Sequence, residues 1–323
     1  MPGVLLLTDP AMADGHAPPG HPERPARLAA AVAGVEAGAG LVGVDLERGE
    51  ITPADDESLL RIHSRGHLAG LEAQAASGGG WLDVETWVGA RSMAAARLAA
   101  GATIGAARAV AQGSASVAFA AVRPPGHHAA VDRAAGFCLL NNIAVAVADL
   151  RAAGLARRIA VVDWDVHHGD GTQAIFDDDP DLCYASTHQS PFYPGTGDRT
   201  ERGQGAAEGT KHNRPLAAGS GDDAFVRVWT ADLLPAIEAY EPDAICVSAG
   251  YDAHRDDPLA GLEVTEAGYH AVGQALGACA ARLGLPGVAM TLEGGYDLQA
   301  LRASIVASVA GLLAGLGLAA RSD

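Results

Sequence analysis

The sequence predicts an α/β protein, with a mostly parallel central sheet and helices on both of its faces. Short apolar or β-branched runs alternate along the chain with longer alanine-rich segments, as repeated β-α-β units require. These short runs are continuously apolar, which is typical of strands buried on both faces. The predicted strands are 4–7, 117–122, 159–162, 182–185, 244–248 and 288–292.

Helices are predicted between these strands, at 25–37, 91–111, 141–153, 223–240, 266–283 and 298–315. Gly113 and Gly154 stand where helices would end, a position that glycine favours. The glycine-rich stretch 203–221 is predicted to be a long loop, and such loops are often functional. No linker divides the chain, so we expect a single domain over 1–323 with a three-layer α/β/α architecture.

Composition excludes some classes of function. The chain has 39 acidic residues against 22 Lys and Arg, giving a net charge of -17. Such a charge repels phosphate backbones and anionic lipids, which argues against nucleic-acid and membrane-surface binding. It is compatible with cationic partners, and equally with an acidic soluble surface. A homo-oligomer is also compatible with the sequence.

Cysteine spacing and the apolar segments predict a cytoplasmic location. The four cysteines form no C-x-x-C pair, which indicates neither a disulfide framework nor a cysteine zinc site. The beginning of the chain has no basic region before its short apolar run, so it predicts a strand rather than a signal peptide. The apolar stretch 305–320 is shorter than the ~20 residues that a membrane span needs, and we expect a buried helix there.

Polar residues that are costly to bury follow four of the predicted strands. RPPGHHA (123–129) follows one, DWDVHHGDG (163–171) a second, SAGYDAH (248–254) a third and LEGGY (292–296) a fourth. In open α/β sheets, ligands bind outside the carboxyl ends of the strands. The four segments are therefore expected to share one pocket.

A metal site is predicted from two of these segments. Alternate residues of an extended chain point to the same side, so Asp165 and His167 can hold one ion. Asp252, which follows a separate strand, can supply a third ligand. Three protein ligands leave a position for water and substrate, as at catalytic zinc sites. A D-x-H pair alone is more often a helix cap or a surface pair, but the second acidic segment and the tandem histidines favour a metal.

The tandem histidines predict proton transfer beside that metal. Amide hydrolysis needs a base for water and an acid for the leaving amine, and His127 and His128 can share this work. We expect Asp163 and Asp170 to orient the two rings, and His168 to be structural.

Tyr296 is predicted to donate a hydrogen bond to a developing oxyanion opposite the metal. The preceding Gly294-Gly295 turn lets the backbone pack closely while the ring projects into the site. An EGGY segment alone indicates only a buried tyrosine, but its position after the last strand favours the catalytic role.

Seven segments together resemble the histone deacetylase family in order and spacing, over nearly the whole chain. The likeness is nearest to class II, to its bacterial relatives and to the acetylpolyamine amidohydrolases. The segments are HPERPARL (21–28), RPPGHHA (123–129), GFCLLNN (136–142), VDWDVHHGDGTQ (162–173), PFYPGTG (191–197), SAGYDAH (248–254) and EGGY (293–296).

The resemblance implies the arginase–deacetylase fold and one catalytic Zn²⁺, held by Asp165, His167 and Asp252. It implies that His128 is the main general base and acid, with His127 as its electrostatic partner. It further implies that Asp170 and Asp163 hydrogen-bond His128 and His127 respectively, and that Tyr296 polarises the amide carbonyl.

It also implies a narrow acyl-lysine tunnel and a structural potassium ion. Phe137 would line the tunnel, faced by Tyr193 where many relatives carry Phe, with Phe192 adjacent. Gly136 would offer its carbonyl to the substrate amide, and Arg27 would stand near the foot of the acetate pocket. K⁺ would be bound mostly by backbone oxygens of Asp163, Asp165, His167, Ser186 and Thr187.

The substrate is less sharply indicated. Polyamine-selective relatives place an acidic residue where this chain has Leu259, and leucine offers no charge to a distant ammonium. We therefore expect an acylated lysine or a compact acylated amine, with acetylpolyamines as the alternative. Glu85 stands where many relatives have an Asp that contacts the substrate backbone, which leaves peptide recognition open.

Two rival classes share this fold. A two-manganese ureohydrolase would need a D-x-D pair after the last strands, and the sequence has none there. A non-catalytic acyl-amine binding protein would be expected to lack the tyrosine or a zinc ligand, yet all are present. Fold resemblance alone does not guarantee activity, so the second rival stays open.

Overall fold

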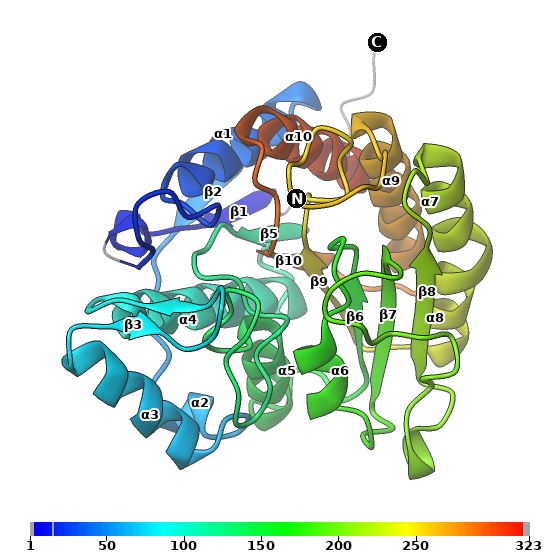
Figure 1. Ribbon diagram of the computed structural model, residues 1–323. Coiled ribbons are helices and arrows are strands. Elements are labelled where there is room, and N and C mark those ends of the chain that lie inside the picture. The colour runs from blue at the N-terminus through cyan, green and yellow to red at the C-terminus, as the bar shows by residue number, and fades with distance from the viewer. Residues whose placement is uncertain (1–2, 15, 319–323) are drawn as a thin grey trace.

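An eight-stranded parallel sheet runs through the centre of the protein (Figure 1). The structure is a computed structural model that describes residues 3–14 and 16–318. The spatial order of the strands is β2-β1-β5-β10-β9-β6-β7-β8, and all neighbours pair in parallel. Their bounds are β1 Val4–Leu7, β2 Leu46–Gly49, β5 Val117–Ala120, β6 Ile159–Asp163, β7 Leu182–Gln189, β8 Lys211–Leu216, β9 Ala244–Ala249 and β10 Val288–Leu292.

Helices cover both faces of this sheet, as the sequence predicts (Figure 1). On one face lie α1 (Ala26–Leu41), α9 (Glu266–Arg282) and α10 (Leu298–Gly315), and on the other α4 (Ser92–Ala111) and α5 (Asn142–Ala152). Strands β5, β6, β7, β9 and β10 are buried along their whole length, which explains why they are mostly apolar, apart from polar residues such as the STHQ end of β7. The remaining α-helices are α2 Asp56–Leu59, α3 Arg65–Ala76, α6 Asp170–Ile175, α7 Asp222–Val228 and α8 Leu234–Tyr240.

Glycines let α9 and α10 pack closely. A Cβ added to Gly273 or Gly277 of α9 would collide with backbone carbonyls of α10, and one added to Gly311 or Gly315 of α10 would collide with α9. Among the described residues, α10 is the one helix long and apolar enough to cross a membrane, but over half of it is buried. It is thus the buried helix that the sequence predicts, although 319–320 of the predicted stretch lie outside the described residues.

One prediction about the second half of the chain was wrong in part, and another needs more detail. The stretch 203–221 is not a continuous loop, because Lys211–Leu216 forms the edge strand β8. Its sequence KHNRPL is polar and half-exposed, so it carries none of the hydrophobic pattern by which strands are predicted. The predicted helix 223–240 is α7 and α8, joined by a π-helical segment, Trp229–Leu233.

The sheet order explains why the polar segments meet. Strands β5, β10, β9 and β6 are consecutive neighbours, although they are far apart in the sequence. Because all four are parallel, the residues that follow them emerge at the same edge of the sheet. Each of the four polar segments follows one of these strands.

Candidate active site

Asp165, His167 and Asp252 form the one group of metal-ligand type among residues 3–14 and 16–318. Their candidate ligand atoms all lie within 4.8 Å of one another. The Nδ1 atom of His167 is 3.1 Å from Oδ1 of Asp165 and 3.3 Å from Oδ2 of Asp252. Both carboxylates are 1% exposed. The structure therefore brings the three predicted ligands together from the segments after β6 and β9.

The hydrogen bonds of the two carboxylates leave one oxygen for a cation. Asp165 accepts backbone N–H groups from His167 (2.9 Å) and Gly294 (2.8 Å), one on each oxygen. Asp252 accepts the N–H of Val166 on Oδ1 (2.9 Å), but its buried Oδ2 has no hydrogen-bond partner. An unpartnered buried carboxylate oxygen is costly unless a cation binds it. Two carboxylates and an imidazole fit a divalent metal with open positions.

The electrostatics agree with a bound cation. Burial and the neighbouring Asp165 raise the pKa of Asp252. Burial would do the same to Asp165, but His127 and His167 hold the pKa of Asp165 well below its usual range. A divalent ion between the two carboxylates would relieve their repulsion.

Two glycines make room for these carboxylates. A Cβ at Gly250 would collide with Asp165, and a Cβ at Gly294 would collide with Asp252 and then with Asp165. Glycine at these positions of the SAGYD and EGGY segments thus lets the backbone lie directly against the two carboxylates.

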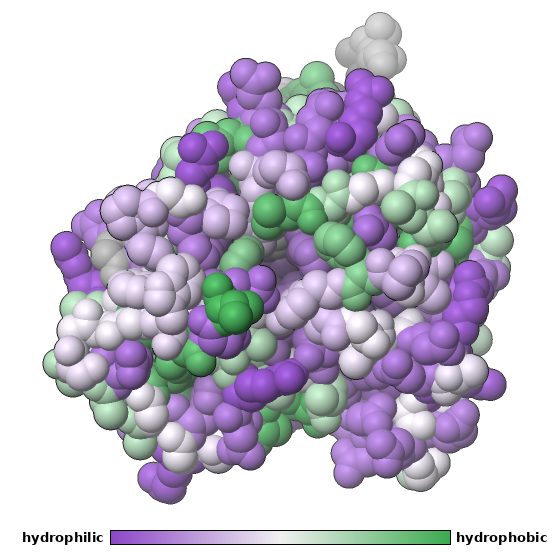
Figure 2. All heavy atoms as spheres, in the orientation of Figure 1, coloured by the Kyte–Doolittle hydropathy of each residue, from purple (hydrophilic) through white to green (hydrophobic). Residues whose placement is uncertain are grey.

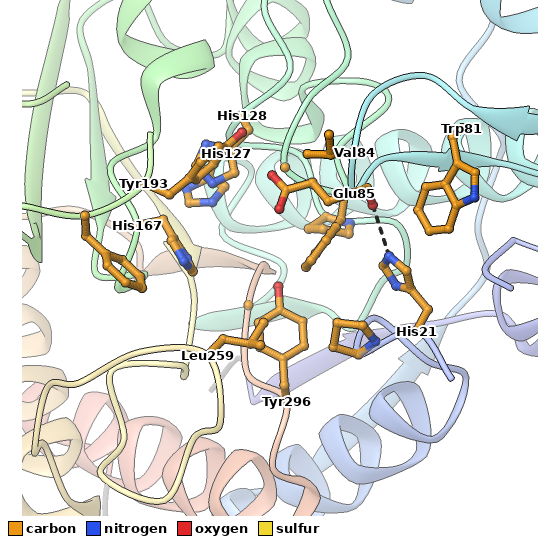
Figure 3. A pocket seen from close by; sticks show the side chains of 16 residues that line it. His21, Trp81, Val84, Glu85, His127, His128, His167, Tyr193, Leu259 and Tyr296 are labelled. Carbon is orange, nitrogen blue, oxygen red and sulfur yellow. Dashed lines mark hydrogen bonds between the residues drawn. The ribbon is translucent and has the colours of Figure 1, made fainter. Parts of the chain in front are cut away.

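His127 and His128 lie side by side above the ligands, with ring centroids 4.0 Å apart (Figure 3). His127 Nδ1 is 3.1 Å from Asp163 Oδ2, and His128 Nδ1 is 2.7 Å from Asp170 Oδ1. In each ring, Nδ1 therefore carries a proton and donates it in a hydrogen bond to the carboxylate. Nε2 of His128 is then left for the pocket, whereas Nε2 of His127 lies 3.8 Å from Asp165 Oδ1.

The two histidines differ in charge. Burial alone would lower the pKa of His127, but Asp165 and Asp163 outweigh it and raise that pKa well above its ordinary value. Burial and the charge on His127 lower the pKa of His128 to about 3. His128 is therefore neutral near pH 7 and can accept a proton, while His127 carries a positive charge beside it.

Tyr296 follows β10 and points its hydroxyl into the pocket toward the histidines (Figure 3). The guanidinium of Arg27 lies 4.8 Å from the centre of its ring, and Phe137 meets the ring edge-on at 5.8 Å. Burial raises the pKa of Tyr296 well above its ordinary value, so its hydroxyl keeps its proton and can donate.

The site opens to solvent through a cavity of about 420 Å³. Figure 2 shows a hollow near the centre of the same view, with apolar residues on its borders. Phe192 stacks on His167 at 5.3 Å, and Tyr193 meets His128 edge-on at 5.1 Å. Six of the predicted substrate-binding residues line the cavity: Glu85, Gly136, Phe137, Phe192, Tyr193 and Leu259.

Local backbone geometry aims Phe137 at the cavity. Gly136 and Phe137 are both left-handed, with φ of 53° and 69°. A Cβ at Gly136 would collide with the ring of His128, so glycine is required there twice over. A left-handed phenylalanine is unusual, and such residues concentrate at functional sites.

The other predicted residues lie outside the cavity lining. Arg27 is fully buried behind Tyr296 and donates to the carbonyl oxygen of Gly295 (2.6 Å). His168 is held by Thr196 (2.8 Å) and Gln173 (3.0 Å), as expected of a structural residue.

Three of the residues predicted to bind potassium, Asp163, Ser186 and Thr187, lie on the neighbouring strands β6 and β7, and the other two, Asp165 and His167, follow β6. Ser186 pairs with Asp163 across β6 and β7, and its hydroxyl contacts His188 Nδ1 at 2.9 Å. The Thr187 hydroxyl accepts the indole N–H of Trp229 (3.1 Å). With both hydroxyls engaged, an ion here would be bound by backbone oxygens, and potassium stays a prediction.

Sequence reasoning did not identify Glu293 as a functional residue. This fully buried carboxylate accepts the N–H groups of Gly126 (2.6 Å) and His127 (3.1 Å) and the hydroxyl of Ser248 (3.1 Å). Burial raises its pKa to about 7. Glu293 thus fixes the turn that carries the histidine pair. Its position between an apolar strand and two glycines was the available signal.

The HPE segment was likewise only partly interpreted. Glu23 binds Arg123 through both oxygens (2.6 and 2.7 Å) and Arg27 through one (2.9 Å), and all three side chains are fully buried. Burial alone would raise the pKa of Glu23, but Arg123 lowers it to about 2. His21 lines the cavity and contacts the carbonyl oxygen of Glu85 at 3.0 Å.

Comparison with known proteins identifies the family. A profile of the Histone deacetylase domain matches residues 21–312. A probable deacetylase of Methanothermobacter thermautotrophicus is 40% identical over 96% of this chain and 90% of its own length. A histone deacetylase-like amidohydrolase of Pseudomonas aeruginosa is 39% identical over 76% of this chain and 65% of its own. The crystal structure of the HDA15 HD domain superposes with a TM-score of 0.90 at 36% identity, covering 98% of this chain and 90% of that one.

The chain therefore belongs to the histone deacetylase domain family. Its fold is the α/β fold of that domain. It is a deacetylase-type amidohydrolase with a candidate metal site at Asp165, His167 and Asp252. The family implies acetylated substrates.

Replacement of Gly294 by Ala should weaken metal binding without unfolding the protein. The added Cβ would displace the Asp252 and Asp165 carboxylates, and displaced ligands typically lose about 10–100-fold in affinity. Zinc titration and thermal denaturation of the purified variant measure the two effects. Gly70→Ala is the matched control, because that helical glycine faces open space. Wild-type zinc affinity in Gly294→Ala would contradict the assigned ligand geometry.

Proposed function

We propose that the protein is a zinc-dependent amidohydrolase that removes acetyl or similar short acyl groups from lysine side chains or related amines. The main support is the cluster of three metal-ligand side chains, one of which, His167, lines a largely apolar cavity together with a neutral histidine and a protonated tyrosine. The names of the relatives, which are deacetylases and an amidohydrolase, support the same reaction.

Asp165, His167 and Asp252 would hold the zinc ion. When bound, zinc would polarise the amide carbonyl and lower the pKa of water in the site. We propose that K⁺ binds as a structural ion beside β6 and β7, through the backbone oxygens named above.

The chain's own residues would move the protons and stabilise the developing charge. His128, held by Asp170, would accept a proton from water as the water oxygen attacks the carbonyl carbon. Tyr296 would donate a hydrogen bond to the oxygen that gains negative charge. His128 would then deliver its proton to the amide nitrogen, so that the C–N bond breaks to release an amine and a carboxylate. His127, positively charged, would stabilise the negative charge without itself losing a proton.

The cavity wall favours a substrate that is neutral near the acyl group. Phe137, Phe192 and Leu259 give the cavity apolar sides, which suit the methylene chain of an acylated lysine. Leu259 offers no counter-charge to a distant ammonium, so we propose acylated lysine ahead of acetylpolyamines.

Turnover by the zinc-loaded protein should distinguish these substrates. We expect hydrolysis of acetyl-lysine peptides with higher kcat/KM than acetylputrescine or acetylspermidine, measured as released acetate. Chelation should abolish turnover and added Zn²⁺ should restore it. A preference of a hundredfold or more for the polyamines would overturn the substrate assignment. Activity that survives complete metal removal would overturn the mechanism.

Tyr296→Phe should lower kcat by about 10²–10³-fold, the usual effect of removing one oxyanion donor. The ring and its contacts with Arg27 and Phe137 stay in place, so zinc content and melting temperature should match the wild type. Steady-state kinetics on an acetyl-lysine peptide measure the loss. A near-normal kcat would remove Tyr296 from the mechanism.

A further inference from the structure

Large hydrophobic side chains are exposed in one place beside the cavity. Trp81 is 51% exposed, Leu82 40% and Val84 96%, and all three belong to the hairpin of β3 (Gly80–Trp81) and β4 (Trp87–Val88). Within the described residues, only three other large hydrophobics are exposed, and one of these, Tyr193, also lines the cavity. Single exposed hydrophobics are common, but a cluster marks a contact surface.

The hairpin tip is held rigidly. Asp83 accepts the N–H groups of Glu85 (2.9 Å) and Thr86 (2.6 Å) and the hydroxyl of Thr86 (3.0 Å). The N–H of Leu82 donates to the carbonyl of Thr86 (2.9 Å). The exposure of Val84 is therefore built into an ordered turn.

The same tip is joined to the tunnel wall. The N–H of Phe137 donates to the Thr86 hydroxyl (3.3 Å), and His21 contacts the carbonyl of Glu85. Trp81 and Val84 themselves line the cavity (Figure 3). Trp81 and Val84 are therefore within reach of the part of a substrate that extends from the cavity when its acyl group is at the metal ligands.

We propose that Trp81 and Val84, which line the cavity, form a substrate-binding surface that takes an apolar side chain next to the acylated lysine of a peptide; Leu82 of the same hairpin lines a separate hollow. This inference rests on the proposed function and names its substrate class more closely. Burial of an apolar side chain against these two residues would add binding energy that a small acylated amine cannot obtain.

Two acetyl-lysine peptides that differ only in the flanking residues, Leu on both sides or Ser on both sides, test this surface. For the wild-type zinc enzyme we expect kcat/KM to be about tenfold higher or more for the Leu peptide. In the double variant Trp81→Ser, Val84→Ser, the ratio should fall close to one. In the control Leu41→Ser, an exposed leucine on α1, it should not change.

Each contrary outcome is distinct. Equal rates on both peptides, or a preference that survives in the double variant, would contradict the proposed substrate-binding surface but not the proposed function. Equal loss on both peptides in the double variant would show general damage and would also contradict that surface. Failure of the wild-type zinc enzyme to hydrolyse any acylated lysine would overturn the proposed function itself.

A second inference concerns Asp257, which no step above uses. Its carboxylate is 6% exposed and accepts backbone N–H groups only. One oxygen accepts from Tyr296 (2.6 Å) and Asp297 (3.4 Å), and the other from Leu259 (3.0 Å). One side chain thus joins the segment after β10 to the loop after β9, at two residues that line the cavity.

We infer that Asp257 is a positioning residue that sets where the Tyr296 hydroxyl stands. Arg27 and Phe137 contact the ring of Tyr296, while Asp257 binds its backbone, so the three together leave the side chain little freedom. An oxyanion donor displaced by even a fraction of an ångström loses much of its effect. This inference depends on the role proposed for Tyr296.

Asp257→Asn tests it, because an amide of the same size has one acceptor oxygen instead of two. We expect kcat to fall about tenfold with KM and zinc content little changed. In a Tyr296→Phe background, the same substitution should have almost no further effect, because the hydroxyl it positions is already absent. Asp222→Asn is the control. Asp222 likewise accepts a backbone N–H, that of Thr265 (2.7 Å), but lies away from the cavity.

An equal fall of kcat in both backgrounds would show a merely structural role and overturn the inference. Unchanged kcat in Asp257→Asn would do so as well. Near-normal kcat in Tyr296→Phe alone would instead overturn the role of the tyrosine.

Discussion

The burial of two carboxylates side by side is the constraint on which the rest of this site depends. Asp165 and Asp252 are almost wholly removed from solvent, where an isolated negative charge is very costly. Backbone N–H groups satisfy three of their four oxygens, and the fourth is left for a cation. The fold supplies those donors from the segments after β6 and β10, while the segment after β9 supplies Asp252 itself. The candidate metal site thus depends on the order of the strands as well as on the ligand side chains.

Buried charge of both signs extends this principle around the site. Glu23, Arg27 and Arg123 form a network with no solvent exposure, and Arg27 and Arg123 also donate to backbone carbonyls. Removing one member of such a network would leave a buried charge without a partner. The network therefore fixes the geometry of its side chains even where its net contribution to stability is small. Glu293 does the same for the histidine turn. The side chains of the candidate site are consequently held by residues that lie outside the cavity lining, and such support keeps an active site preorganised.

Sequence patterns predicted the elements that are buried and apolar. All six predicted strands are present, because buried parallel strands carry a continuous hydrophobic signal. The edge strands β2 and β8 were missed, since LERG and KHNRPL are polar and pair on one side only. The chemistry-bearing residues were found by their place after the strands. Glu293 and Asp257 were not found, because a carboxylate that accepts backbone N–H groups stands at no characteristic spacing from other residues in the sequence.

By itself, the sequence determined the fold class, the family resemblance and the residue types that could hold a metal and move protons, because these follow from local pattern and motif. Only the tertiary structure decided that β5, β10, β9 and β6 are neighbours, that Asp252 keeps an unpartnered oxygen, and that His127 and His128 differ in charge. The physical reason is that burial, hydrogen bonding and electrostatic coupling depend on distances between segments far apart in the chain. No local pattern encodes those distances.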